Sequence, residues 1–284
     1  MENDRFDRQK LWFGEEGQKK IELETVGIVG LGGTGSQINQ GLAYLGVRNF
    51  VLVDEDIADE TNLNRLIGAS EEDVTNLTPK VLIAERTIKH ISPSATVDAI
   101  KTNIRHKRAI DALKGCTTLF GCVDNDGARL VISELAAAYS IPLIDSSTEI
   151  ISESGRPLHY GGRVVVARPG DFCLSCANEI DMEVAKQELS DPLSKEVRKK
   201  HGYGLAEQHK SPAVVSLNGV IANMAVTEFL VMVTGLREPN RYLHYKADRG
   251  MVSPRSYEQN PGCFTCNYLV GTKEKANLYR YISQ

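Results

Sequence analysis

The most constraining feature of this sequence is a short apolar run that leads directly into a glycine-rich turn. Val26–Val29 has the pattern of a buried strand, and Gly30–Ser36 satisfies the spacing G-x-G-x-x-G before a helical pattern begins. Glycines are needed there because the backbone must bend sharply and let phosphate oxygens approach. The helix offers free N–H groups and a partial positive charge at its N-terminus. We therefore expect a nucleotide-binding loop formed by Gly30, Gly32, Gly33 and Gly35.

The first half of the chain alternates strand and helix patterns, which is typical of βαβ units on a parallel sheet. Apolar runs predict strands at Val26–Leu31, Phe50–Val53, Thr96–Ile100, Thr117–Val123 and Pro142–Asp145. Apolar residues at helical spacing predict helices at Ser36–Leu45, Lys80–His90, His106–Leu113 and Ala128–Tyr139. The predicted fold is α/β, with a Rossmann-like, doubly wound and mostly parallel sheet.

The pattern changes after Arg156, where Arg163–Ala167 and Tyr242–Ala247 are predicted as strands that extend the sheet, in part antiparallel. Asn178–Ser211 is polar and rich in Lys and Glu; we interpret it as a partly helical loop crossing one face, or else as a solvated insertion without a role. Pro212–Gly235 is predicted as a long apolar core helix. The tail from Asn267 has no clear pattern.

Net charge excludes one class of partner. The 284 residues carry a formal charge of −4, so no global basic field favours nucleic acid or an anionic membrane. The N-terminus lacks an apolar leader, and no stretch is expected to reach the length of a membrane span. These features predict a cytoplasmic protein.

A group of polar residues after the second strand favours ATP over a dinucleotide. Asp54 ends that strand, where a carboxylate can accept hydrogen bonds from ribose hydroxyls. Asn62, Arg65 and Lys80 follow. A dehydrogenase has no need of such cations, whereas attack on the α-phosphate of ATP builds negative charge that they can stabilise.

A second carboxylate, Asp124, follows the strand pattern Thr117–Val123 and is itself followed by Asn125. Ligands of doubly wound sheets bind at the carboxyl ends of the strands. An Asp in that place suits Mg²⁺.

Five short motifs follow one another along the chain: Arg5–Gln9, Gly30–Gly35, Asp54 with Asn62–Arg65, Pro79–Lys80 and Cys122–Asn125. Together they resemble the MoeB/ThiF/HesA adenylyltransferases, which are relatives of the ubiquitin-activating enzymes. The C-terminal half, including Arg163–Ala167, Tyr245–Ala247 and Asn260–Cys263, is similar to the compact enzyme that activates the ubiquitin-fold modifier.

The resemblance implies a role for each matching residue. Asp54 would hold the ribose of ATP, the backbone at Gly32 and Gly33 would pass close to the nucleotide, and Asp124 would hold Mg²⁺. Arg8 would reach the active site of a neighbouring subunit, which implies a homodimer. The remaining residues expected at the nucleotide are Asn62, Arg65, Lys80 and Asn125, with Arg129 less clearly assigned.

The implied reaction is ATP-dependent adenylation of a carboxylate, giving an acyl-adenylate and pyrophosphate. The expected substrate is the C-terminal glycine of a ubiquitin-like or sulfur-carrier protein. Adenylation of a ribosomally made peptide is one alternative, and an NAD-dependent oxidoreductase or an inactive scaffold that binds a modifier are others. No general base is required, because the carboxylate is already ionised at pH 7.

Two C-x-x-C pairs predict a structural zinc site that joins distant parts of the chain, since four thiolates fit tetrahedral Zn²⁺. Two unrelated pairs of buried thiols, or a redox pair, would give the same sequence pattern. The four residues are Cys173, Cys176, Cys263 and Cys266.

The other two cysteines, Cys116 and Cys122, are predicted as small core residues rather than nucleophiles. Ubiquitin-activating relatives carry a thioester-forming cysteine in the crossing loop, but Gly202–Pro212 contains none. We therefore expect adenylation without a conventional loop-cysteine thioester. His201 and His209 lie in this loop and are expected to be exposed and inactive.

These predictions divide the chain into three parts. Residues 1–24 form a helical arm that contacts the second subunit, and residues 25–150 form the ATP-binding half. Residues 151–284 hold the sheet extension, the crossing loop over 178–211 and the zinc-bound C-terminal part.

Overall fold

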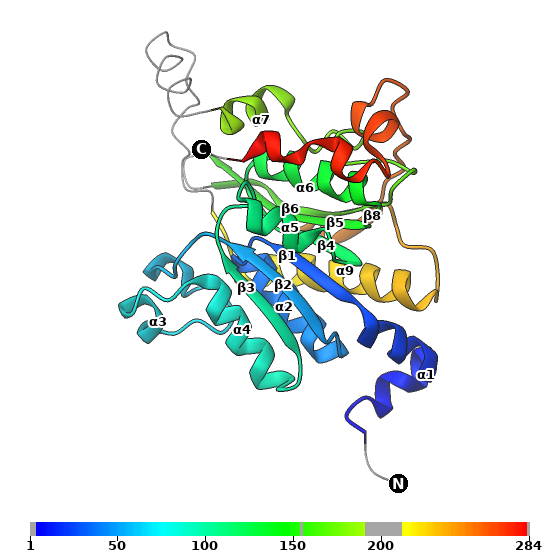
Figure 1. The fold of residues 1–284 in the computed structure, drawn as a ribbon. Helices are drawn as coiled ribbons and strands as arrows, with labels where there is room; N and C mark the ends of the chain where they lie inside the picture. The colour runs from blue at the N-terminus through cyan, green and yellow to red at the C-terminus, as the bar shows by residue number, and fades with distance from the viewer. Residues whose placement is uncertain (1–3, 154–155, 191–211, 283–284) are drawn as a thin grey trace.

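The structure is a computed structural model and describes residues 4–153, 156–190 and 212–282. Its eight-stranded sheet has the order β3-β2-β1-β4-β5-β6-β7-β8 (Figure 1). The parallel strands are β1 (Thr25–Val29), β2 (Asn49–Asp54), β3 (Thr96–Lys101), β4 (Thr118–Gly121) and β5 (Leu143–Glu153). The antiparallel strands are β6 (Arg156–Ala167), β7 (Tyr242–Lys246) and β8 (Met251–Pro254). The predicted mostly parallel α/β sheet with an antiparallel extension is confirmed.

The antiparallel part is larger than the sequence predicts. β5 continues past Asp145 to Glu153, and β6 begins at Arg156, so that the two pair along nearly their whole length. This stretch mixes polar and apolar residues because it lies beyond the part of the sheet that is buried on both faces. β8 is a short, exposed edge strand and carries no apolar run.

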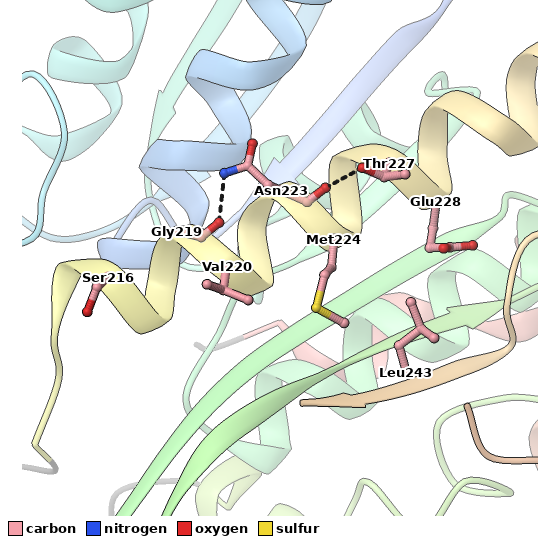
Figure 2. Close-up of a pocket in the computed structure, with 8 residues that line it drawn as sticks. All are labelled: Ser216, Gly219, Val220, Asn223, Met224, Thr227, Glu228 and Leu243. Carbon is pink, nitrogen blue, oxygen red and sulfur yellow. Dashed lines mark hydrogen bonds between the residues drawn. The ribbon is translucent and has the colours of Figure 1, made fainter. Parts of the chain in front are cut away.

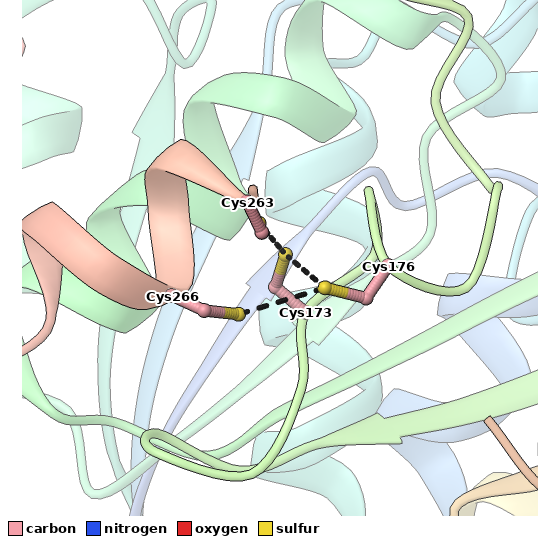
Figure 3. Close-up of side chains that lie close together, drawn as sticks. All are labelled: Cys173, Cys176, Cys263 and Cys266. Carbon is pink, nitrogen blue, oxygen red and sulfur yellow. Dashed lines mark hydrogen bonds between the residues drawn. The ribbon is translucent and has the colours of Figure 1, made fainter. Parts of the chain in front are cut away.

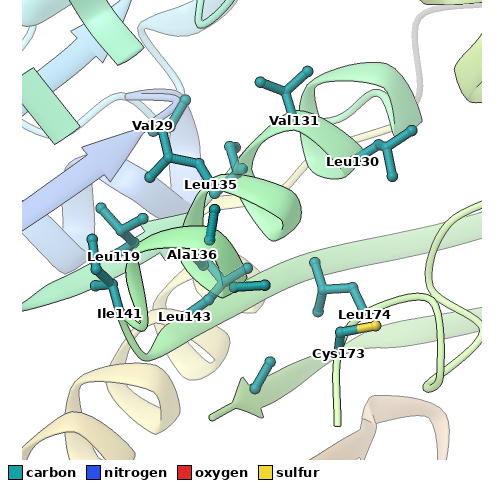
Figure 4. Close-up of a cluster of buried hydrophobic side chains, with 14 of the residues drawn as sticks. Val29, Leu119, Leu130, Val131, Leu135, Ala136, Ile141, Leu143, Cys173 and Leu174 are labelled. Atoms are coloured by element: carbon teal, nitrogen blue, oxygen red, sulfur yellow. The ribbon is translucent and has the colours of Figure 1, made fainter. Parts of the chain in front are cut away.

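Helices cover both faces of the sheet. α2 (Gly33–Leu45), α4 (Lys80–Ile91) and α9 (Val215–Thr234) pack in one apolar cluster, while α5 (Lys107–Leu113) and α6 (Asp126–Tyr139) pack in the other. α6 is buried along almost its entire length. Figure 4 shows its apolar side chains against the strands and against the start of the cysteine-bearing loop; they include Leu130, Val131, Leu135 and Ala136, with Val29, Leu119, Leu143 and Leu174.

The remaining elements are short or lie outside the sheet layers. α1 (Asp7–Leu23) forms the predicted N-terminal arm, and α7 (Met182–Leu189) makes the predicted crossing loop partly helical. Residues 191–211, with His201, His209 and most of Gly202–Pro212, lie outside the described residues. α3 (Glu71–Thr75) and five short helical turns were not predicted: η1 (Glu60–Asn62), η2 (Ala247–Arg249), η3 (Thr265–Leu269), η4 (Lys273–Ala276) and η5 (Leu278–Tyr281).

The expectation that no stretch reaches the length of a membrane span is wrong for α9. Within the described residues, this helix of 20 residues is long and apolar enough by length and composition alone. In the fold it packs along α2 and against β5 and β6, with Phe229 fully buried, as a core helix does. Its apolar character therefore reflects burial on the sheet.

Candidate functional site

The glycine-rich turn joins β1 to α2 and requires glycine at two positions. Gly30 has φ +89°, and a Cβ atom there would lie 2.5 Å from the carbonyl oxygen of Cys122. A Cβ at Gly35 would lie 2.0 Å from the carbonyl oxygen of Gly30. Larger residues would therefore push the turn away from β4.

The N-terminal end of α2 is open. Gly32 is its N-cap residue, no side chain caps the helix, and the space where a Gly32 side chain would lie has no atom within 4 Å. The first N–H groups of a helix have no partner within it and carry its positive dipole end. This geometry suits an anionic group such as a phosphate.

Asp54 is fixed beside this turn by backbone donors. The Leu31 N–H donates to its Oδ2 at 2.6 Å and the Asp56 N–H to its Oδ1 at 2.8 Å. Burial raises the pKa of Asp54 above its usual value, while Lys80 and the two N–H groups act in the opposite direction. Each carboxylate oxygen retains a lone pair that can accept a hydroxyl hydrogen bond.

Two predicted cations lie near the turn but are paired with neighbours in this structure. Lys80, the first residue of α4, binds Asp56 at 2.7 Å. Arg65 donates to the Thr61 carbonyl and, at 3.0 Å, to Asn64 Oδ1. The Cδ of Arg65 also lies 3.2 Å from where a Cβ of residue 33 would be. Both cations are thus held at the edge of the turn, Lys80 by a side chain and Arg65 by a backbone carbonyl and a side chain, and phosphate oxygens can replace these partners.

Asn62 and Asn125 have local structural partners. Asn62 is buried in η1, where its Oδ1 accepts from the Asp59 N–H at 3.5 Å. Asn125 caps α6, because its Oδ1 accepts from the Ala128 N–H at 2.8 Å. Capping explains an asparagine at position 125 without any ligand.

Asp124 lies just beyond the end of β4. Cys122, two residues before it, packs against Gly30, so this end of β4 lies next to the glycine turn. It is exposed, and it makes no hydrogen bond or ion pair with any residue that the structure describes. A free carboxylate of this kind is available to a cation and fits the donor chemistry that Mg²⁺ prefers.

Arg8 lies at the opposite end of α2 from the glycine turn. Its neighbour Gln9 donates from Nε2 to the Leu45 carbonyl at 2.9 Å, and Phe6 packs on Gly46 just after α2. The 13 residues of α2 span about 20 Å. Arg8 is exposed and has no ion pair within the described ranges, so it does not reach the glycine turn of its own chain.

The four cysteines of the two C-x-x-C pairs meet in space, and their sulfur atoms lie within 4.8 Å of one another (Figure 3). The Sγ separations include 3.8 Å for Cys173–Cys176, 3.4 Å for Cys173–Cys263 and 3.7 Å for Cys176–Cys266. Tetrahedral Zn²⁺ with Zn–S bonds near 2.3 Å requires sulfur atoms about 3.8 Å apart. The cluster therefore fits a structural zinc ion, and it joins the loop after β6 to the C-terminal turns.

A buried ion network that the sequence did not predict links this loop to the end of β4. Arg163 binds Asp145 and Glu179, the latter three residues after Cys176. Arg129 lies 3.6 Å from Asp145 and donates to the Val123 carbonyl at 3.1 Å. The sequence feature that could have indicated this network is an arginine inside the apolar run of β6.

A groove that the sequence did not predict lies along α9, beside Leu243 of β7. It has a volume of about 560 Å³, and Figure 2 shows Val220, Met224 and Leu243 along it. None of the predicted site residues lines it.

Comparisons with known proteins give a consistent result. The model of the ThiF family matches residues 6–265. Ubiquitin-like modifier-activating enzyme 5 of Drosophila persimilis is 25% identical over 269 residues, covering 90% of this chain and 64% of the relative. The sulfur carrier protein ThiS adenylyltransferase of Escherichia coli is 29% identical over 154 residues, covering 54% of this chain and 57% of the relative. The chain thus spans less than two thirds of the length of these relatives.

Among solved structures, E. coli MccB crystallised with AMPCPP and MccA has the same fold. The TM-score is 0.71 at 18% identity, over 94% of this chain and 75% of MccB.

Proposed function

The chain belongs to the ThiF family, and from this premise we propose that it adenylates a carboxylate with ATP, giving an acyl-adenylate and pyrophosphate. The proposed substrate is the C-terminal glycine of a ubiquitin-like or sulfur-carrier protein. One observation carries the proposal: the open N-terminus of α2 lies beside the carboxylate of Asp54, which the Leu31 N–H of the glycine turn holds in place.

Each residue then has a role set by its chemistry. Asp54 accepts hydrogen bonds from the ribose, and the N–H groups after Gly32 receive phosphate oxygens. Arg65 and Lys80 leave their present partners to bind the phosphates, where negative charge increases during the reaction. Asn62 and Asn125 act at the nucleotide through the turns that they stabilise. The substrate carboxylate attacks the α-phosphorus, so positioning and electrostatics provide most of the catalysis.

Two metals fit this chain. Asp124 would hold Mg²⁺, which neutralises phosphate charge when bound. The four cysteines would hold Zn²⁺ in a structural role, since four protein ligands leave no open position for catalysis.

We also propose that Arg8 acts across the interface of a homodimer. Its support is geometric, because Arg8 follows the segment that packs on the C-terminal end of α2, and this helix extends about 20 Å from the glycine turn. An arginine that must reach phosphate can then only do so in a second subunit. A cytoplasmic location agrees with the six free cysteines.

The acyl group is expected to leave the enzyme without a loop-cysteine thioester. Cys116 and Cys122 are unsuited to replace it, because burial raises the pKa of each thiol to about 12. The lack of a cysteine in the crossing-loop sequence also supports a second candidate substrate, the carboxylate of a ribosomally made peptide. An NAD-dependent reaction would leave Arg65, Lys80 and Asp124 without a role.

ATP–pyrophosphate exchange tests the proposal, using purified protein and fractions of small proteins and peptides from the source cell. We expect exchange that depends on one fraction, is lost in Asp124→Asn and is retained in Asp98→Asn, which changes a partly exposed carboxylate on β3 that is paired with Arg108. Thermal stabilisation by NAD but not by ATP–Mg²⁺ would contradict adenylation.

A further inference from the structure

Asn218 is a buried polar residue to which the proposed function gives no role. It lies near the N-terminal end of α9 and is only 3% exposed. A buried amide is costly unless its polar atoms have defined partners. Its contacts therefore indicate why an amide stands at this position.

The carbonyl end of the Asn218 amide is anchored to the sheet. The Thr148 hydroxyl, on the extended part of β5, donates to Asn218 Oδ1 at 3.0 Å. This bond turns the other end of the amide, Nδ2, away from β5.

The Nδ2 end lies against the start of the glycine-loop helix. A Cβ atom at Gly33 would be 2.0 Å from Asn218 Nδ2, and the side chain of Arg65 borders the same space at 3.2 Å. Gly33 is the first residue of α2, and the N–H groups of this turn are those that face the open site. The amide thus occupies the volume that any side chain at residue 33 would need.

A second contact holds the two helices together at this end. Gln37, one turn further along α2, donates from Nε2 to the Val215 carbonyl at 3.0 Å. Gln37 also lies close to Gly219 of α9, where a Cβ would be 2.8 Å from its Oε1. The beginnings of α2 and α9 are therefore side by side, with Asn218 between α2 and β5.

We propose that Asn218 is a positioning residue for the nucleotide: its amide, held by Thr148, sets the place of the first turn of α2 and limits where Arg65 can lie. The inference rests on the proposed function, because it concerns how the same site meets ATP. It assigns to α9 an effect on phosphate binding that acts through the position of α2 and Arg65.

The test compares ATP affinity, measured by calorimetry, with the melting temperature in a set of variants of the full chain. Asn218→Ala should weaken ATP binding about tenfold, because a phosphate-binding turn that moves slightly loses much of its effect. Asn39→Ala is the matched control: Asn39 is also buried on one of these helices, but it donates to the Ala84 carbonyl at 3.1 Å and serves packing against α4. That variant should lower the melting temperature and leave ATP affinity within about twofold.

A double variant tests the contact itself. Gly33→Ala should weaken ATP binding more than Asn218→Ala does, because the new Cβ collides with the amide. Adding Asn218→Ala to Gly33→Ala should then improve binding, a reversal of sign that independent sites do not show. Thr148→Val, which removes only the anchoring hydroxyl, should weaken ATP binding about threefold. This variant replaces Asn218→Ala as the test if Asn218→Ala does not fold.

Wild-type affinity in Asn218→Ala, or in Thr148→Val, would overturn the inference, as would a double variant that binds no better than Gly33→Ala. Wild-type protein that binds ATP but catalyses no exchange would contradict the proposed reaction alone. Wild-type protein that binds no ATP would overturn both.

Discussion

Asp124 differs from the other carboxylates near the glycine turn in having no partner among the described residues. Asp54 accepts two backbone N–H groups, and Asp56 binds Lys80. A carboxylate that stabilises neither a turn nor an ion pair can be changed with little effect on folding. Any loss of activity on changing it can then be assigned to the reaction.

Asp124→Asn should lower ATP–pyrophosphate exchange by at least about a hundredfold, the usual effect of removing one electrostatic contact to a transition state. The melting temperature should shift by less than about 2 °C, since the side chain is exposed and has no partner in the part of the chain that the structure describes. Parallel exchange and thermal-unfolding measurements check this. A variant with normal exchange would remove Asp124 from the site.

The two core cysteines give a prediction about pH. Burial raises the pKa of Cys116 and Cys122 from 9.0 to about 12, so that below pH 9 their thiolate fraction should be about a thousandfold lower than that of a free thiol. Alkylation of these two residues in the folded protein should therefore stay slow up to pH 9 and become fast on unfolding. Rapid labelling of either residue at pH 8 would show that it is accessible and reopen the question of a thioester.

At the scale of elements, the loop after β6 is held in place by two separate sets of contacts. The cysteine cluster joins it to the C-terminal turns, and Glu179 joins it to Arg163 in the sheet. Arg163 is a buried arginine that binds both Asp145 and Glu179. Such a residue is far more sensitive to loss than an exposed ion pair.

Arg163→Met should lower the free energy of unfolding by about 3 kcal/mol, because partly buried Glu179 loses its cation and buried Asp145 keeps only Arg129, at 3.6 Å. Urea unfolding of the variant and of the wild-type protein measures this difference. A loss below about 1 kcal/mol would mean that the network is not important for stability.

The cysteine cluster should bind about one zinc ion per chain. Cys263→Ser or a strong chelator should remove the metal and lower the melting temperature, because binding free energy of a structural zinc is also folding free energy. Metal analysis and thermal unfolding on the same samples check this. A metal-free protein with an unchanged melting temperature would refute the zinc assignment.

The elements also show what the sequence could and could not predict. Strands of the parallel half were predictable because burial on both faces makes them continuous apolar runs. The far half of β5, the start of β6 and the edge strand β8 lack such runs, since each has an exposed face. The glycine turn and Asp54 were found because their spacing is local. Asn218, Arg163 and Glu179 were missed because only tertiary packing brings them to their partners, which lie far away in the sequence.

At the scale of the whole molecule, one chain does not contain the complete proposed site. The glycine turn and Arg8 lie at opposite ends of α2, so the account requires a second subunit. Homodimers with a two-fold axis place equivalent residues symmetrically, so that each subunit could complete the site of the other.

Mixed dimers test this requirement. Arg8→Ala and Asp124→Asn variants, each inactive alone, should regain activity when unfolded together and refolded as a mixture. Statistical mixing would give half mixed dimers with one intact site each, hence about a quarter of wild-type exchange. Arg8→Ala with full activity alone, or a mixture with no activity, would contradict the action of Arg8 across the interface.

The central claim, attack of a carboxylate on the α-phosphorus of ATP, is tested most directly by isotope transfer. The substrate selected by the exchange assay is prepared with a heavy oxygen isotope in its C-terminal carboxylate, incubated with enzyme and ATP, and the adenylate is released with hydroxylamine. The account predicts AMP that carries one heavy oxygen atom, because the bridging oxygen comes from the carboxylate and leaves with the nucleotide. Unlabelled AMP, or ADP together with labelled phosphate, would contradict it.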